Sequence, residues 1–435
     1  MNTSNYISII ADDLTGANDT ALQFFMQGCK TQVSFGEDIS INEDLKTEVF
    51  AISTESRNIS SDIAVERVKK VANDILKEYN FEYVYKKIDS VLRGNIGKEI
   101  TTLLDELNFD AAVIFPAFPN EGRTTIGGYH LLKGIPLQRT EFSRDPICPI
   151  TESNIVNLLK NQLGEENEQY IDLISLDTIM KGAGPILTKL NELISKGKKL
   201  IVADAVHTTD LEQIALALTK SPYNILPCGA AGAAQALSKI WNPSNEEETN
   251  KNFKLPNLPK LIVSGSATEM TASQIKRLQE NDNIDNTYFI AIKPENIFTN
   301  DFENIAQRII NNLVKDNVVV VHSSSLIENT EQLNELLFEY EITKDAFISK
   351  ICDYLAAITR SVLMQKEAIL ITIGGETSYK CSRAIGSKNL QIIDTVAPAI
   401  PLEIDHKGQY IVTKSGNLGT QNTLVDIVKY FEQDK

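Results

Sequence analysis

Short runs of apolar, often β-branched residues alternate along the chain with longer stretches in which apolar positions recur every three or four residues. In the first half, the runs that we expect to be buried strands are residues 6–11, 49–54, 83–88, 111–115, 171–176 and 200–203. Between two of them, residues 61–79 place Ile63, Val68, Val71, Ile75 and Tyr79 on one face of an expected helix. This alternation predicts an α/β fold with a mostly parallel sheet covered by helices.

The alternation stops at residues 241–260, which are rich in Asn, Glu, Lys and Pro, so we expect an exposed linker there. It resumes in expected strands at 261–263, 288–292, 318–321, 368–373 and 410–412. A chain of 435 residues is too long for one ordinary hydrophobic core. We therefore predict two domains, 1–240 and 258–435, joined by a linker at 241–257. Each domain is expected to be a mostly parallel sheet flanked by helices, with the active site in the interdomain cleft.

Composition and charge limit the kinds of molecule that we expect the protein to bind. The formal net charge of -16 opposes binding to nucleic acid or to an anionic membrane, but it leaves room for a small anion in a local basic pocket. The five cysteines and four histidines are dispersed, so neither a disulfide framework nor a transition-metal site is indicated. The first residues lack a signal-peptide pattern, and no apolar run approaches the roughly 20 residues of a membrane span. We expect a cytoplasmic protein.

Two carboxylates follow the first expected strand. Asp12 and Asp13 precede Thr15 and Gly16, which open an expected helix. Ligands bind at the carboxyl ends of strands in open α/β sheets, so one carboxylate could take a proton from an attacking hydroxyl. The alternative is that both aspartates only cap the helix. A haloacid-dehalogenase-type phosphatase is disfavoured, because its motif separates the two aspartates by one residue.

A charged segment follows the expected strand at 83–88. Lys87 and Asp89 share a face of the extended chain, and Arg93 follows. Lys86, Lys87 and Arg93 outnumber Asp89, which predicts positive charge left free for a carboxylate ligand. The alternative is a solvated charged loop.

Two other strand ends add cations. Arg57 follows the strand at 49–54, and residues 116–128 form an expected Pro/Gly loop with its own arginine. The coincidence of charge on consecutive strand ends predicts a ligand site better than any one segment does.

Three glycine-bearing segments follow strands in the second half, at residues 263–268, 373–378 and 414–419. Glycines let the backbone approach a phosphate closely, so three such segments predict a nucleotide site. Residues 94–98 have the wrong spacing for a Walker A loop, and no dinucleotide fingerprint follows the first strand.

Taken together, the chain resembles the four-carbon acid sugar kinases nearly from end to end. The matching segments, in order, are IADDLTGAND, STESR, KKIDSVLRGNIG, PAFPNEGRTTIGG, VSGSATEMTASQI, TIGGETS and TKSGNLG. The resemblance implies an N-terminal domain that binds the sugar acid and a C-terminal domain that binds ATP. It also implies that ATP, with Mg²⁺, phosphorylates the terminal (C4) hydroxyl of threonate, erythronate or 3-oxo-tetronate.

The resemblance also implies site residues by position. The acid-sugar site would contain Asp12, Arg57, Lys87, Asp89, Ser90 and Arg93, and the nucleotide site would contain Ser266, Gly374, Gly375, Glu376, Thr377 and Gly419. The chain departs from the family pattern at Val91, where Thr is common, at residues 229–232 and at Leu418. Val91 is nearest the substrate and leaves the choice of acid open.

We therefore predict phosphoryl transfer from ATP to the C4 hydroxyl of a tetronate-like acid. Arg57, Lys87 and Arg93 are expected to orient the substrate carboxylate, and Asp12 or Asp13 to orient or deprotonate the hydroxyl. Mg²⁺ and the glycine-loop amides would do most of the catalytic work. The alternatives are a phosphatase, a kinase for a larger sugar acid and a non-catalytic sensor. The sequence leaves the metal ligands and the oligomeric state open, a homo-oligomer included.

Overall fold

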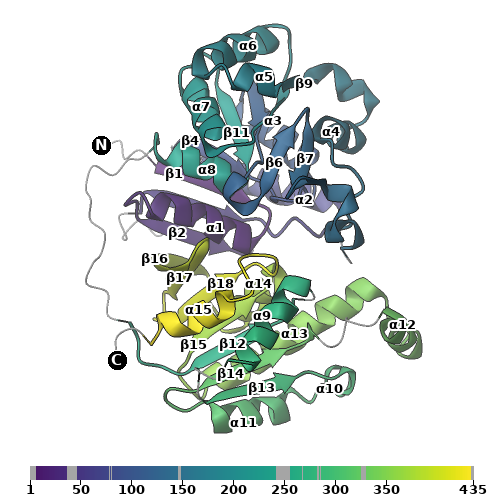
Figure 1. Cartoon of the computed structure of the whole chain (residues 1–435), viewed down its shortest axis with the longest axis vertical. Helices are drawn as coiled ribbons and strands as arrows, with labels where there is room; N and C mark the ends of the chain where they lie inside the picture. Colours follow the sequence, from purple (N-terminus) through teal and green to yellow (C-terminus); the bar gives the residue numbers. More distant parts are fainter. Residues whose placement is uncertain are drawn as a thin grey trace. The chain divides into compact units, whose positions relative to one another are not determined.

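The computed structural model describes residues 6–36, 47–77, 79, 81–145, 148–241, 255–266, 268–281, 284, 286–324 and 330–432. These residues form two compact units, one before residue 242 and one after residue 254 (Figure 1). Strand β2 (Thr31–Phe35) is divided between them, since its residues 33–35 group with the second unit.

The first unit is built on a parallel sheet. Its strands lie in the order β3 (Val49–Ser53), β1 (Tyr6–Ala11), β4 (Phe81–Lys87), β11 (Ile225–Gly229), β5 (Ala111–Ile114), β10 (Leu200–Ala203) and β9 (Ile171–Ile174). Every neighbouring pair in this order is parallel. Strands β1, β3, β5 and β10 are almost wholly buried, as expected where helices cover both faces of a sheet. The predicted parallel α/β fold is confirmed.

Helices pack in two layers on this sheet. The first layer contains α1 (Leu14–Phe25), α8 (Ala231–Ser238), α7 (Thr208–Thr219), α6 (Ala183–Ser195) and the short α5 (Leu176–Ile179). The second contains α2 (Ser61–Val71) with its continuation η2 (Ala72–Leu76), α3 (Ile96–Leu107) and α4 (Ile155–Leu163), followed by η6 (Glu165–Tyr170).

The helix expected at 61–79 is shorter than predicted. The regular α-helix ends at Val71, and Ile63 is exposed rather than buried. The buried face instead contains Ala64, Val68, Val71 and Ile75, which recur every three or four residues. This series begins at Ala64, the residue after Ile63.

Residues 116–128 are not the long loop that the sequence suggested. A single turn, η3 (Pro119–Glu121), leads into β6 (Arg123–Ile126), which pairs with β7 (Tyr129–Leu132) and then β8 (Ile135–Pro136) in a small antiparallel sheet. Gly127 and Gly128 form the hairpin turn with φ values of +59° and +77°, a conformation that favours glycine at both positions. Two further turns, η4 (Leu137–Arg139) and η5 (Glu141–Arg144), follow.

The second unit has its own mostly parallel sheet. The order is β13 (Thr287–Ala291), β14 (Val318–His322), β12 (Lys260–Ser264), β15 (Ile369–Ile373), β18 (Tyr410–Lys414), β17 (Ile400–Asp405) and β16 (Asn389–Ala397). The first five strands are parallel, and β17 and β16 add an antiparallel edge.

Helices α9 (Glu269–Gln279) and α15 (Thr423–Tyr430) pack together in one layer of this unit. Another layer contains α10 (Pro294–Thr299), α11 (Phe302–Asn312), α13 (Lys344–Leu363) and α14 (Gly375–Ala384), and α12 (Thr330–Glu339) precedes α13. Ile262, Ile371, Val412 and Leu424 lie at the centre of its core and are fully buried.

Most of the expected linker, residues 242–254, lies outside the described residues. Its predicted start needs correction, because Trp241 is only 5% exposed and stacks on Tyr83 with ring centroids 4.7 Å apart. At the other end, Lys260 is buried as the first residue of β12. The exact domain limits and the interdomain cleft remain predictions.

Candidate active site

Three strand ends of the first unit lie side by side. Ala11, the last residue of β1, pairs with Ser53 at the end of β3 and with Lys87 at the end of β4. The segments that follow these strands therefore share one edge of the sheet, where α/β proteins bind ligands.

Arg57 and the two aspartates after β1 form a buried ion cluster. The Arg57 guanidinium donates to Asp12 through Nε to Oδ2 and Nη2 to Oδ1, both at 2.8 Å. It also donates to Asp13 through Nη1 to Oδ2 and Nη2 to Oδ1, both at 2.7 Å. At most about a tenth of each side chain is exposed. One arginine thus holds both carboxylates in fixed orientations.

The two aspartates have different surroundings. Asp13 is the N-cap of α1: its Oδ1 accepts from the Gly16 backbone N–H at 2.9 Å, and its Oδ2 accepts from Thr15 Oγ1 at 2.8 Å. The capping alternative thus describes Asp13. Burial raises the pKa of Asp12, but the hydrogen-bonded Arg57, together with Lys86 and Lys87, outweighs burial and holds that pKa below its ordinary value. Asp12 is therefore a charged acceptor, suited to orienting a hydroxyl rather than to removing its proton early.

Asp89 and Arg93 form a second ion cluster. Arg93 donates to Asp89 Oδ2 at 2.7 Å and to Asp145 Oδ2 at 3.0 Å. Asp89 also lies 3.7 Å from the Arg57 guanidinium, which links the two clusters. Burial opposes the charged form of Asp89, yet Arg93 and Arg57 hold its pKa well below its usual range. The predicted residues Asp12, Arg57, Asp89 and Arg93 therefore come together.

The expected surplus of positive charge does not exist at this strand end. Lys86 is fully buried and forms a 2.6 Å ion pair with Glu99 of α3. Lys87 points to the other side of β4, where its Nζ donates to the Ile88 carbonyl at 2.9 Å beside Gly16. The prediction was wrong because it left out Glu99, in the helix that follows β4, and Asp145, 52 residues after Arg93. The segment is buried rather than a solvated loop.

Ser90 and Gly94 complete this group. The Ser90 carbonyl accepts from His130 Nε2 at 3.1 Å, while its hydroxyl has no hydrogen-bond partner among the described residues. Gly94 has φ of +93°, and a Cβ there would lie 3.2 Å from Asp12 Oδ2. Glycine thus allows the segment after β4 to contact Asp12.

Two charged residues near this edge were missed by the sequence-based site. Asp19 of α1 has an enclosed Oδ1 with no donor among the described residues, and burial raises its pKa to about 7. It lies four residues after Thr15 and thus on the same helix face, which was the available signal. The second residue, Arg123 of β6, is considered below.

The three predicted glycine segments of the second unit converge. A Cβ on Gly416 would lie 2.3 Å from Ser266 Oγ, and one on Gly374 would lie 3.6 Å from the Ser266 backbone nitrogen. The Gly374 N–H donates to the Lys414 carbonyl at 2.8 Å. The ends of β12, β15 and β18 therefore meet around Ser266.

The first turn of α14 carries the residues that were predicted to bind a nucleotide phosphate. Gly374 is its N-cap with φ of +110°, and Gly375 begins the helix. Thr377 is buried with its hydroxyl near Cys352, and the Glu376 carboxylate lies 3.3 Å from Lys380. These contacts leave the backbone N–H groups, rather than these side chains, to meet a ligand.

Gly419 lies farther along the segment after β18. It has φ of +88°, and a Cβ there would lie 2.3 Å from Thr423 Oγ1 at the start of α15. Gln274 of α9 holds this segment by donating to the carbonyls of Leu418 at 3.1 Å and Thr420 at 2.8 Å. Gly419 is thus connected to Ser266 through α9 rather than by direct contact.

Lys414, within the third glycine segment, was not among the expected site residues. Its side chain is fully buried, its Nζ donates to the Ser415 carbonyl at 2.8 Å, and burial lowers its pKa to about 7.

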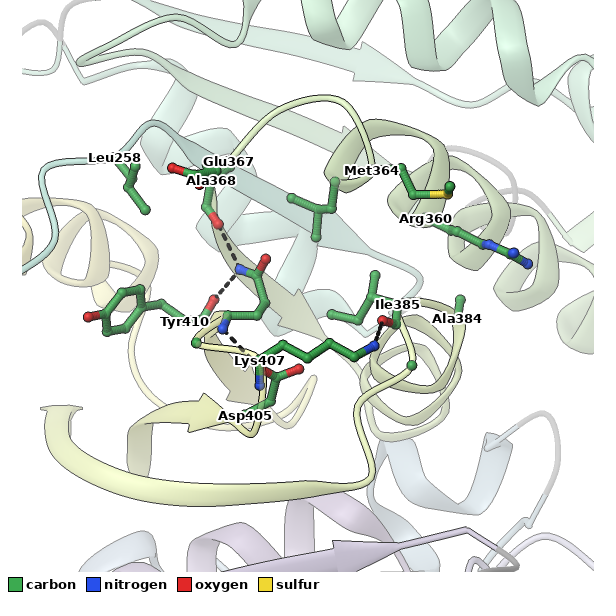
Figure 2. A pocket seen from close by; sticks show the side chains of 14 residues that line it. Leu258, Arg360, Met364, Glu367, Ala368, Ala384, Ile385, Asp405, Lys407 and Tyr410 are labelled. Atoms are coloured by element: carbon green, nitrogen blue, oxygen red, sulfur yellow. Dashed lines mark hydrogen bonds between the residues drawn. The ribbon is translucent and has the colours of Figure 1, made fainter.

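A pocket of about 590 Å³ lies elsewhere in the second unit (Figure 2). Its lining includes Ala368 and Tyr410 at the beginnings of β15 and β18, and Lys407, which donates to the Ile385 carbonyl at 2.8 Å. It therefore lies at the amino edge of the sheet, opposite the glycine segments, and is not the predicted nucleotide site.

Among the described residues, no group of three or more His, Cys, Asp or Glu side chains is arranged to hold a metal ion. This arrangement does not fit an all-protein Mg²⁺ cage.

Comparison with known proteins identifies both units. The family described as "Sugar-binding N-terminal domain" matches residues 7–237, and "Nucleotide-binding C-terminal domain" matches residues 261–424. The chain belongs to the four-carbon acid sugar kinase family. It is therefore a sugar-acid kinase.

Relatives of this kinase align over nearly their whole length. A D-threonate kinase from Salmonella typhimurium is 30% identical, with 98% of each chain covered. A D-erythronate kinase from Heliobacterium modesticaldum is 28% identical, covering 98% of this chain and 96% of the relative. A 3-oxo-tetronate kinase from Haemophilus influenzae is 27% identical, covering 96% and 97%.

A solved structure of a Haemophilus influenzae protein, 26% identical to this kinase, superposes with a TM-score of 0.71 over 98% of this chain and 99% of the other. In the described part of the kinase, none of the helices has the length and apolar character to span a membrane.

Proposed function

We propose that this kinase transfers the γ-phosphoryl group of ATP to the C4 hydroxyl of a four-carbon sugar acid of the threonate, erythronate or 3-oxo-tetronate type. The observation that carries the proposal is the pair of ion clusters at one sheet edge of the unit that matches the sugar-binding family. Kinases named for these three acids align with the chain from end to end.

In this proposal, Asp12 orients the attacking hydroxyl. Asp12 is charged, and its side chain is bound by Arg57, whereas Asp13 is also occupied by capping α1. Arg57 is therefore a positioning residue that keeps the Asp12 carboxylate fixed. The rest of the acid-sugar site consists of Lys87, Asp89, Ser90 and Arg93. The Ser90 hydroxyl, which has no partner among the described residues, is available to a substrate hydroxyl.

The nucleotide phosphates would bind at the N-terminus of α14 and along the segments that carry Ser266 and Gly419. Backbone N–H groups there supply donors that need no reorientation during phosphoryl transfer. Mg²⁺, when bound with ATP, would neutralise phosphate charge.

A coupled assay of ADP release tests this function. We expect ATP turnover that depends on one isomer among the threonates, erythronates and 3-oxo-tetronates. Turnover with a larger sugar acid alone would assign the kinase to that substrate. Acid binding without any turnover would instead identify a sensor.

A further inference from the structure

Arg123 differs from the other two arginines of this sheet edge in what it contacts. Arg57 and Arg93 each donate to two carboxylates. Arg123 is 7% exposed, its Nη1 donates to the Glu121 backbone carbonyl at 3.1 Å, and the Glu121 carboxylate is 3.7 Å away. Its buried Nε donates to no group among the described residues. Burying a guanidinium with an unpaired N–H group costs free energy of folding, and a ligand that accepts that hydrogen bond offsets the cost.

The environment of Arg123 is consistent with this incomplete pairing. Burial lowers its pKa, and the attraction of Glu121, Asp89 and Asp19 only partly offsets that effect. Arg57 and Arg93 differ in this respect, since their carboxylate partners raise their pKa values above the ordinary one.

The fold directs Arg123 toward the predicted acid-sugar site. Arg123 and Thr125 are the buried residues of β6, so their side chains share its inner face, while Ile126 is exposed. Thr125 Oγ1 lies 2.9 Å from His130 Nδ1, and His130 Nε2 in turn lies 3.1 Å from the Ser90 carbonyl. The inner face of β6 is therefore held against the segment that carries Asp89 and Ser90.

We propose that Arg123 binds the carboxylate of the substrate acid, an inference that rests on the proposed function. The Nε edge of a guanidinium forms paired hydrogen bonds with a carboxylate, and Nε of Arg123 has no acceptor among the described residues. Arg57 and Arg93 would have to give up carboxylates of the protein itself to do the same.

The position also suits the chemistry of a four-carbon acid. Its carboxylate and its C4 hydroxyl are at opposite ends of the molecule, so different residues must bind them. Arg123 comes from the small antiparallel sheet, whereas Asp12 follows β1 of the main sheet. Anchoring the carboxylate at Arg123 would favour acids over polyols and would leave Asp12 to the hydroxyl.

Calorimetry with D-threonate, D-erythronate and the uncharged D-threonamide tests this assignment. The proteins are the wild type, Arg123→Gln, Arg123→Lys and the control Arg139→Gln, which removes an exposed arginine of the same unit. We expect Arg123→Gln to weaken binding of the preferred acid by about 30-fold or more. Threonamide binding should change by less than about threefold, and Arg123→Lys should recover part of the acid affinity because it restores the charge.

Several results would overturn the assignment. Unchanged acid binding in Arg123→Gln, or equal weakening of acid and amide in both Arg123 variants, would show that Arg123 does not recognise the carboxylate. Turnover decides the function separately: a wild type that binds the acid without forming ADP refutes the proposed kinase reaction and leaves the Arg123 assignment standing. A wild type that binds none of the threonate, erythronate and 3-oxo-tetronate isomers overturns both.

Discussion

Arg57 binds Asp12 through two hydrogen bonds of 2.8 Å, Nε to Oδ2 and Nη2 to Oδ1, across 45 residues of sequence. The same guanidinium binds Asp13, but Asp13 also caps α1 and Asp12 does not. The helix cap, rather than the pairing with Arg57, therefore distinguishes two adjacent aspartates that the sequence alone leaves equivalent.

Replacing Asp12 tests the role given to it. We expect Asp12→Asn to lower kcat by roughly 10²–10⁴-fold, because the charged acceptor for the attacking hydroxyl is lost. Asp13→Asn is the matched control, since Asn still caps a helix and kcat should fall less than about tenfold. Steady-state kinetics with thermal melts of both variants provide the comparison. A larger loss in Asp13→Asn would reverse the assignment.

Arg57→Gln removes the cation shared by two buried carboxylates. We expect a loss of about 3–5 kcal/mol in the free energy of unfolding near pH 7, because both carboxylates are left without their main partner. The pKa of Asp12 is lowered in the folded state, so its stabilising effect exists above the unfolded pKa of about 3.8 and disappears as pH falls through the folded value. The difference between variant and wild type should therefore shrink on acidification. Urea melts measure this difference in the free energy of unfolding at pH 7 and at the lowest pH where the wild type is folded. A difference that stays constant between the two pH values would contradict the pairing.

Gly374→Ala tests the nucleotide site. Alanine is strained at φ of +110°, so the segment before α14 has to move, and we expect ATP affinity to fall at least tenfold. Gly408→Ala is the control: Gly408 has φ of +85° with open space around it, in the turn before β18 at the other edge of the sheet. Both variants should lose on the order of 1 kcal/mol of stability. ATP binding measured by calorimetry should change only in Gly374→Ala. Equal losses of ATP affinity in the two variants would show that the nucleotide does not bind at the N-terminus of α14.

Glu403 of β17 predicts a pH dependence of stability. Burial raises its pKa to about 8, Thr413 Oγ1 donates to its Oε2 at 3.0 Å, and its Oε1 has no donor among the described residues. Between about pH 4.5 and pH 8 the native state keeps a proton that the unfolded chain releases, so this residue makes stability fall as pH rises. Glu403→Gln should therefore stabilise the protein increasingly from pH 5 to pH 9. The control variant Glu339→Gln changes an exposed residue and should show no such trend in thermal melts. An effect of Glu403→Gln that does not change with pH would contradict burial of Glu403 in its protonated form.

The strand ends that carry chemistry could be predicted from the sequence, because apolar runs followed by Asp, Lys, Arg or Gly identify where each strand stops. The pairing of those side chains could not. Glu99 pairs with Lys86, and Asp145 pairs with Arg93. These carboxylates belong to other segments of the chain, and the sequence does not indicate which cation each one contacts.

Strand β11 and the β6–β7 hairpin were missed for identifiable reasons. Strand β11 has Pro227 in its middle, which usually argues against a central strand, yet it pairs on both sides with β4 and β5. The β6–β7 hairpin did carry a signal, since Gly127-Gly128 between short β-type runs is a hairpin turn sequence. Recognising that hairpin would have placed Arg123 on a strand facing the site.

The central claim is phosphorylation of a four-carbon acid at C4. Wild-type protein incubated with ATP, Mg²⁺ and each threonate, erythronate or 3-oxo-tetronate isomer should give one phosphorylated acid per ADP, and ³¹P NMR should show coupling of its phosphorus to the C4 protons. The 4-deoxy analogue of the active acid should give no product. An absence of acid-dependent phosphorylation across all isomers, or a product phosphorylated at C2 or C3, would contradict this account.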